Sequence, residues 1–463
     1  MASGGRRRGV TRESGLAGAA GRLALGLALA FAAGAAAAQE PQPKAGSIDA
    51  VQAGRYFQEA ASVCERDAGR MWGTNLYGAL MFVDPDTRDL VANRPDYKNQ
   101  LSPRGDVFAG TLPTEENVAN TSARWAGVTW TMLRWPLPEE QFERDKLMVH
   151  ELYHRVQDQL GLGGPDTSSD HLDTRDGRVW MQLEWRALGA AVVAKKDAGR
   201  KAAEDALTFR AYRRSLFKDS GAREQALEMH EGLAEYTGVV LCAKSRSAAA
   251  LYAAAALAGA PKLTTFVRSF AYVTGPAYGL LLDDASPDWR KGLKAQDDLG
   301  DLLAKAIGAV LPPDLKAAAE TRAKAYGGKD LMASEDALFV KKKQETASLR
   351  ARFVDGPVLI LPLREAFSYS FDSTDQVPLE GFGTVYPFVR VVTSWGVLEA
   401  TNGALLVVKD SVIAGIRLPA PKDASARPLK GDGWTLDVKD GWSVVPGPRP
   451  GDLELKRTSP GLR

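Results

Sequence analysis

The stretch 139–160, EEQFERDKLMVHELYHRVQDQL, decides how the rest of the chain is interpreted. It begins with acidic residues and stops at Gly161, and these boundary signals predict a single helix. The motif His-Glu-x-x-His lies in this helix, with His150 and His154 four residues apart. Residues at i and i+4 share a helical face about 5–6 Å apart, close enough for two imidazoles to bind one Zn²⁺. Glu151 projects beside them, where it can take a proton from water at the metal.

The overall composition makes this pair of histidines informative. The chain has 463 residues, of which 45% are hydrophobic and 25% charged, as in an ordinary soluble globular protein. It holds four histidines and two cysteines, so a zinc finger or an iron–sulfur cluster is excluded by the thiol count. With so few histidines, the motif is expected by chance in roughly two of a thousand such sequences. Chance is therefore a poor explanation for it.

The hydrophobic pattern divides the chain into three parts. Residues 70–137 contain short runs of strand type, among them a β-branched and aromatic run at 128–135. The period is helical over 138–350, and short strands separated by turn residues return afterwards. We therefore predict an α+β protein. A small N-terminal β-sheet and a largely helical part form one domain over 39–350, and an all-β module follows over 352–463.

One turn signal stands out in the C-terminal module. Asn402-Gly403 separates two apolar runs, 389–400 and 404–408. Asn-Gly between apolar runs is the strongest short-range signal of a β-hairpin. We therefore predict that these two runs pair through that turn.

A second helix, predicted over 222–241, supplies acids that could complete the site, because a catalytic zinc usually has three protein ligands. Carboxylates in a mostly apolar helix need partners. Glu231 and Glu235 share one face, so a metal can satisfy the first, and the second can accept an N–H from a ligand histidine. Glu184, an acid among bulky apolar residues, is a rival third ligand. We favour Glu231, because the Gly and Ala beside it permit close helix packing.

The sequence HELYH, followed downstream by EGLAEYTG, resembles the gluzincin metallopeptidases, the group of thermolysin and the zinc aminopeptidases. The resemblance covers the two helices rather than the whole chain. It implies a zincin-like catalytic domain over 39–350 that holds one Zn²⁺. In the residues of this sequence, it implies His150, His154 and Glu231 as metal ligands, Glu151 as general base and Glu235 as the acid that orients a ligand histidine.

Two departures from the family pattern affect this interpretation. The interval between the two motifs is longer than in compact members, which implies an inserted helical hairpin at about residues 176–218. Position 230 is His where asparagine is common, so we expect His230 beside the metal or the substrate. Related enzymes often place a tyrosine after the third ligand to stabilise the oxyanion. Tyr272 and Tyr278 are the candidates, and we favour Tyr278.

The first 38 residues have the pattern of a signal peptide, with a basic start, an apolar run at 23–38 and small residues at its end. The alternative is an uncleaved membrane anchor. These residues carry five arginines and one glutamate, so the formal charge of +2 becomes −2 without them. That balance does not suggest nucleic acid as a partner. We expect a periplasmic or secreted protein with no stable membrane span after cleavage.

Export affects the two cysteines. Cys64 and Cys242 would meet an oxidising compartment, where they either form one disulfide or remain two buried thiols that never meet. We favour the disulfide. His171 lies among acids in a Gly/Asp/Ser-rich segment, so we expect it in a solvent-exposed loop.

Together these patterns predict an exported zinc peptidase that acts on peptides or proteins through a metal-activated water, with Glu151 as general base. Two alternatives use the same motif. One is a non-catalytic zinc-binding envelope protein whose β module over 352–463 binds a partner. The other is a zinc hydrolase of a non-peptide amide.

Overall fold

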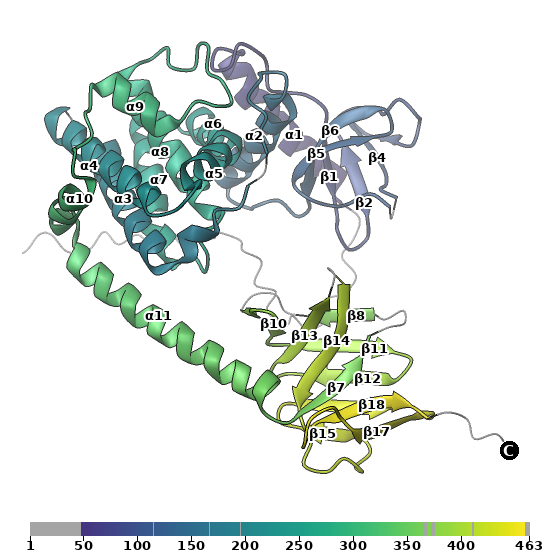
Figure 1. Cartoon of the computed structure of the whole chain (residues 1–463). Helices are drawn as coiled ribbons and strands as arrows, with labels where there is room; N and C mark the ends of the chain where they lie inside the picture. The colour runs from purple at the N-terminus through teal and green to yellow at the C-terminus, as the bar shows by residue number, and fades with distance from the viewer. Residues whose placement is uncertain are drawn as a thin grey trace, which may run out of the picture. The chain divides into compact units, whose positions relative to one another are not determined.

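The computed structural model describes residues 48–113, 115–165, 167–194, 196–363, 368–371, 376–409 and 412–458. The predicted signal peptide, residues 1–38, lies outside them. The predicted α+β class is confirmed: a small N-terminal sheet is followed by a helical region and then by two further sheets (Figure 1). Among the described residues, no helix combines the length and the apolar character needed to cross a membrane.

The N-terminal part consists of helix α1 and a six-stranded sheet. The order in the sheet is β3-β4-β2-β1-β6-β5, and β1 runs parallel to β6 while its other strand pairs are antiparallel. Alternate residues of a strand face opposite sides, so Leu80 and Phe82 pack against the helices while Met81 and Val83 line a separate apolar cluster. The bounds are α1 Ala50–Asp67, β1 Leu80–Val83, β2 Asp89–Ala92, β3 Ser102–Arg104, β4 Val107–Thr111, β5 Thr121–Trp125 and β6 Val128–Arg134.

The helical region begins with α2, the helix that carries the histidine motif. Its N-cap is Glu140, whose carboxylate accepts a hydrogen bond of 2.8 Å from the backbone N–H of Glu143. Its apolar face, with Met148 and Leu152, packs in the same core as Leu80 and Phe82 of the sheet. The helix bounds are α2 Gln141–Gln157, α3 Arg175–Val193, α4 Lys196–Ser215, α5 Ser220–Leu227, α6 Leu233–Cys242, α7 Arg246–Gly259, α8 Ser269–Ala285, α9 Leu299–Ile307, α10 Leu315–Ala323 and α11 Gly328–Arg350.

Short helical turns link some of these helices. The most important is a π-turn at Glu228–Gly232, which joins α5 to α6 within the predicted second helix. Such wide turns are rare and occur often at functional sites. The other short turns are Asp170–Asp173, Ala260–Lys262, Lys324–Tyr326 and Ala351–Asp355.

The C-terminal module contains two sheets, ordered β17-β18-β7-β14-β13-β10-β9 and β15-β16-β12-β11-β8. Side chains such as Trp395, Leu406 and Ile416 form its core. The strand bounds are β7 Val358–Pro362, β8 Ser368–Phe371, β9 Val377–Leu379, β10 Gly383–Tyr386, β11 Val389–Thr393, β12 Gly396–Ala400, β13 Ala404–Lys409, β14 Val412–Pro419, β15 Leu429–Gly431, β16 Trp434–Val438, β17 Trp442–Pro446 and β18 Leu453–Arg457.

The predicted hairpin at Asn402-Gly403 is wrong. The chain turns earlier, so that β11 pairs with β12 inside the first apolar run. β12 and β13, on either side of the Asn-Gly turn, belong to different sheets. The turn therefore carries the chain from one sheet to the other, and β12 pairs with β11 and β16 while β13 pairs with β10 and β14.

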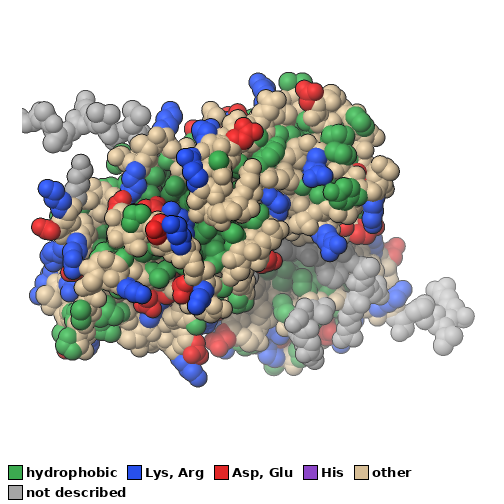
Figure 2. All heavy atoms as spheres, turned by 90° about the horizontal axis from the view of Figure 1, so that it is seen from above, with side chains coloured by type: hydrophobic (Ala, Val, Ile, Leu, Met, Phe, Trp, Pro, Cys, Tyr) green, Lys and Arg blue, Asp and Glu red, His purple; other side chains and the backbone are tan. Residues whose placement is uncertain are grey.

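Charged side chains are spread over the surface. Figure 2 shows basic and acidic groups interspersed on the viewed face, with apolar side chains between them. This mixture agrees with a formal charge close to zero for the whole chain.

Candidate metal centre

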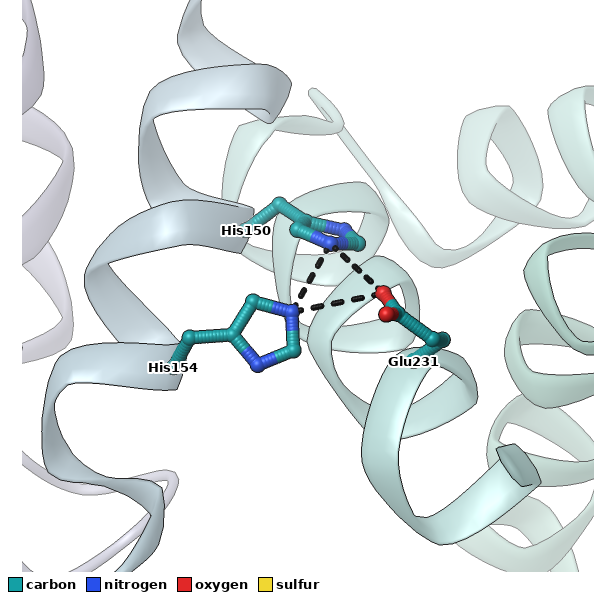
Figure 3. Close-up of side chains that lie close together, drawn as sticks. All are labelled: His150, His154 and Glu231. Carbon is teal, nitrogen blue, oxygen red and sulfur yellow. Dashed lines mark hydrogen bonds and ion pairs between the residues drawn. The ribbon is translucent and has the colours of Figure 1, made fainter. Parts of the chain in front are cut away.

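Two helices bring three potential ligand side chains to one point. His150 and His154 project from α2, and Glu231 projects from the π-turn of the facing helix (Figure 3). The Nε2 atoms of the two histidines are 3.1 Å apart, and each lies 3.4 Å from Oε2 of Glu231. These three side chains form a group that could hold a metal ion.

Hydrogen bonds on the far side of each imidazole fix the orientation of both rings. Nδ1 of His150 donates to Oε2 of Glu235 over 3.0 Å. Nδ1 of His154 lies 2.9 Å from Oε1 of Gln157. The amide nitrogen of Gln157 donates to the carbonyl oxygen of Met229 over 3.0 Å, so its oxygen must face His154 as an acceptor. Each ring, when neutral, therefore carries its proton on Nδ1 and presents the Nε2 lone pair to the shared point.

The charges around this point favour a cation there. Burial lowers the pKa of His150, but hydrogen bonds to Glu231 and Glu235 outweigh it and raise that pKa to about 10. Burial acts to raise the pKa of Glu231, yet its contacts with the two histidines hold it far below the usual range. The surroundings thus stabilise positive charge between the ligands, which a proton or a metal ion can supply. The donor set of two imidazoles and one carboxylate fits Zn²⁺.

Lys146 supports the centre from the opposite side of Glu235. Its ammonium forms an ion pair with Oε1 of Glu235 and is largely buried. Burial alone would raise the pKa of Glu235, but the charge of Lys146 and the bond to His150 lower it to about 2. Glu235 is therefore an ionised acceptor for the Nδ1–H of His150, which is the contact predicted for it from the sequence. The role of Lys146 was not predicted from the sequence, although Lys146 lies one turn before His150 on the same helix.

Glu151 lies next to both ligands in sequence and is only 6% exposed. Burial raises the pKa of its carboxyl group, and the charges of His150 and His154 counteract part of that effect. A buried carboxylate with a raised pKa is a stronger base than an exposed one. The carboxyl group of Glu151 is thus close enough to the candidate ligands for their charges to affect its pKa.

The tyrosine prediction needs a correction. Tyr278 is fully buried, and its hydroxyl donates to Oε1 of Glu184 over 2.7 Å, away from the centre. Tyr272 is the tyrosine at the site, because its hydroxyl donates to Oε2 of Glu231 over 2.7 Å and its ring stacks on His150. Six residues along a helix rotate a side chain by about 240° at 100° per residue. The side chains of the two tyrosines of α8 therefore point in different directions, Tyr272 to Glu231 and Tyr278 to Glu184.

Glu231, which we favoured from the sequence as the third ligand, converges with the two histidines, whereas the rival candidate Glu184 does not. The Glu184 carboxylate is completely buried and accepts hydrogen bonds from Arg210 over 3.3 Å, from Arg213 and from Tyr278. Two guanidinium groups thus already compensate its charge. An acid among apolar residues indicated that a partner must exist, but the sequence did not show that this partner is arginine.

Two further side chains border the candidate ligands. The ring centroids of His230 and His154 are 4.7 Å apart, and Nε2 of His230 lies 3.8 Å from Oε1 of Glu231. Nη2 of Arg268 donates to the same oxygen over 3.2 Å. Arg268 was missed from the sequence, because it reaches Glu231 from the start of α8 and no local pattern links the two.

The cysteine and His171 predictions also change. Cys64 and Cys242 are free thiols, so the disulfide favoured from sequence is wrong. Both pack as small apolar residues in the same helical core, and burial raises the pKa of Cys64 to about 12. His171 is buried rather than solvent-exposed, and its Nε2 lies 2.8 Å from Oε1 of Glu224.

Comparison with known proteins adds nothing to this geometry. No family model matches the chain, and neither a curated protein nor a solved structure matches it. The resemblance to gluzincins therefore depends on the residues of the two helices alone.

Proposed function

We propose that this protein is an exported zinc-dependent peptidase whose metal ligands are His150, His154 and Glu231. The convergence of their ligand atoms supports the proposal: two Nε2 atoms and one carboxylate oxygen lie within 3.4 Å of each other. The outer nitrogen of each ring is already bonded, so the inner lone pairs are directed to the shared point. We assign Glu151, the buried neighbour of His150 in the sequence, as the base that such a hydrolysis needs.

When bound, zinc at such a site supplies Lewis acidity, because it polarises a carbonyl oxygen and lowers the pKa of a coordinated water. The side chains of the protein do the remaining work. Glu151 accepts the proton of the attacking water and passes it to the leaving amine. The hydroxyl of Tyr272 donates to the candidate ligand Glu231, and we assign it the role of the donor that stabilises negative charge on the carbonyl oxygen. Glu235 and Gln157 keep both imidazoles in the productive tautomer.

The variant Glu151→Gln tests this role most directly. We expect it to keep stoichiometric zinc, because Glu151 is not a ligand, and to lose cleavage of a broad peptide library by several orders of magnitude. Metal analysis and mass spectrometry of the digested library measure the two effects. Full activity in the variant would overturn the mechanism.

The wild-type protein in the same assay separates the peptidase from its alternatives. Stoichiometric zinc without any peptide cleavage would refute the peptidase. The protein would then be a non-catalytic zinc-binding protein, or a zinc hydrolase whose substrate is a non-peptide amide. A panel of acyl-amide substrates distinguishes those two outcomes.

A further inference from the structure

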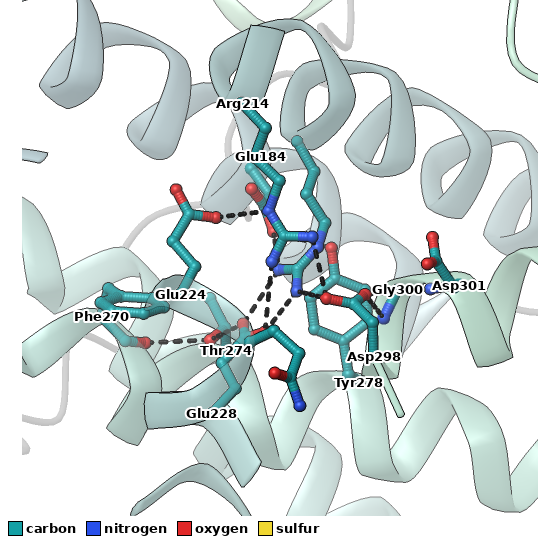
Figure 4. A network of polar contacts seen from close by, with 12 residues as sticks. Glu184, Arg214, Glu224, Glu228, Phe270, Thr274, Tyr278, Asp298, Gly300 and Asp301 are labelled. Carbon is teal, nitrogen blue, oxygen red and sulfur yellow. Dashed lines mark hydrogen bonds and ion pairs between the residues drawn. The ribbon is translucent and has the colours of Figure 1, made fainter. Parts of the chain in front are cut away.

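A network of buried ionic side chains includes Glu228, three residues before Glu231 of the candidate metal centre (Figure 4). Its members come from α3, α4, α5, the π-turn and the start of α9, so it joins five segments of the helical region. Within it, four carboxylates meet three guanidinium groups, and all seven side chains are buried or nearly so. The residues are Glu184, Glu224, Glu228, Asp298, Arg210, Arg213 and Arg214.

Glu228 links this network to the π-turn. Its carboxylate is completely buried, and Oε1 accepts hydrogen bonds from Nη1 of Arg210 over 2.9 Å and from the hydroxyl of Thr274 over 2.6 Å. Oε2 pairs with Nη2 of the same guanidinium. Arg210 is in turn fixed by Asp298, whose Oδ2 is 3.0 Å from Nη2. The Glu228 carboxylate is therefore held by one guanidinium group and one hydroxyl group, and the guanidinium is itself paired with Asp298.

The same turn carries Glu231, three residues later. In a regular α-helix, residues three apart lie only about 60° from each other around the axis, at 100° per residue. The π-turn Glu228–Gly232 is wider, with i→i+5 hydrogen bonds, and so spreads the two carboxylates further apart. Glu228 faces the ionic network, and Glu231 faces the histidines of α2.

Helix α8 closes on the turn from another side. A Cβ atom on Gly275 would overlap the carbonyl oxygen of Gly232, so the two backbones are in direct contact. This close approach places Thr274 against Glu228, and it places Tyr272 against Glu231. Glu228 and Glu231 therefore contact the same helix, α8, from opposite sides of one turn.

We propose that Glu228 is a positioning residue for the metal ligand Glu231. Its ion pair with Arg210 and its hydrogen bond from Thr274 hold the π-turn in the form that sets the Glu231 carboxylate 3.4 Å from both histidine nitrogens. This inference depends on the metal-binding part of the proposed function and not on peptide cleavage. Without these two contacts, the Glu231 side chain would also occupy other positions, and the three ligand atoms would be held less precisely.

The experiment compares Glu228→Gln with Glu335→Gln, a matched control. Glu335 is also a buried glutamate paired with an arginine, since it accepts from Nε of Arg178 over 2.9 Å, but it contacts neither the π-turn nor the ligands. Both variants remove one buried charge and keep the side-chain volume. The zinc dissociation constant is measured by competition with a chromophoric chelator, and the visible spectrum of the Co²⁺-loaded protein reports on ligand geometry.

We expect Glu228→Gln to bind zinc at least about tenfold more weakly and to change the Co²⁺ spectrum, as loss of a residue that orients a ligand does. Glu335→Gln should lower the melting temperature and leave the zinc affinity within about twofold, as expected for a distant site. Zinc affinity and a Co²⁺ spectrum identical to wild type in Glu228→Gln would overturn the proposal. So would an equal loss of affinity in both variants.

A milder variant decides the matter if Glu228→Gln does not fold. Thr274→Val removes one hydrogen bond to Glu228 at nearly constant volume, and we expect a weaker zinc affinity in the same direction. Unchanged affinity in that variant would refute the positioning role. A wild type that binds zinc but cleaves no peptide refutes the peptidase and leaves this measurement intact, whereas a wild type that binds no zinc overturns both.

Discussion

Replacing Glu231 and Glu184 by glutamine, one at a time, separates metal binding from folding. Both are buried glutamates of the helical region, and the sequence alone offers both as a third ligand. The structure gives them different partners. Glu231 meets two histidine nitrogens at 3.4 Å, whereas Glu184 accepts hydrogen bonds from two arginines and a tyrosine.

The expected magnitudes follow from these partners. Loss of a residue that only orients a ligand weakens metal affinity about 10–100-fold. Replacing Glu231, which we propose as a ligand itself, should therefore weaken zinc affinity by more than about 100-fold. Neutralising Glu184 leaves Arg210 and Arg213 undercompensated in the core, and breaking a buried ion pair of this kind costs about 3–5 kcal/mol of stability. Glu184→Gln should weaken zinc binding by less than about tenfold, because it reaches the centre only through Arg210 and the π-turn.

The two variants are compared by chelator competition for zinc and by thermal melting of the metal-free proteins. In Glu231→Gln we expect a lost or greatly weakened metal. Its apoprotein should also melt at a lower temperature than wild type, because the Glu231 carboxylate pairs with two histidines and accepts hydrogen bonds from Arg268 and Tyr272. In Glu184→Gln we expect a clear fall in melting temperature with zinc retained, so retention of zinc separates the two variants. If Glu184→Gln removed the metal and Glu231→Gln kept it, the ligand assignment would be wrong.

Two further predictions concern the tyrosines and the pH dependence of stability. Tyr272→Phe should lower kcat about 100-fold, the usual cost of removing a donor to an oxyanion. Tyr278→Phe should keep kcat and lose about 1.5–3 kcal/mol of stability, because it loses the hydrogen bond to Glu184. Steady-state kinetics and melting curves measure both effects, and the opposite pattern would contradict the assignment. Burial and the charge of Glu59 raise the pKa of Asp145 to about 6, above about 3.9 in an unfolded chain. Its stabilising contribution is therefore complete below about pH 4 and is lost as the pH rises through 6. Asp145→Asn should melt at a higher temperature than wild type at pH 8 but not at pH 4, and equal shifts at both pH values would refute this reasoning.

Features that depend on neighbouring residues in the chain could be predicted from the sequence. The spacing of His150 and His154 fixes their common face, because a helix returns to the same side after four residues. Glu231 and Glu235 follow the same rule on the second helix. The strand and helix patterns likewise gave the order of the three parts, since period 2 and period 3.6 are local properties of the backbone.

Features that depend on contacts between distant segments could not be predicted in this way. Asn402-Gly403 favours a turn locally, but the choice of strand partner is made by the packing of two whole sheets. The two cysteines are separated by 178 positions, and only the packing of α1 and α6 decides that their thiols are not bonded to each other. The π-turn depends similarly on its surroundings, because Arg210 and Thr274 reach it from α4 and α8.

The sequence by itself therefore determined the α+β class and the shared face of His150 and His154, because residues four apart lie on the same side of a helix. Only the tertiary structure decided that Glu231 rather than Glu184 faces the histidines and that Tyr272 rather than Tyr278 lies at the centre. The physical reason is that a buried acid must find a cation or donor, and which one it meets is set by helix packing across long stretches of chain.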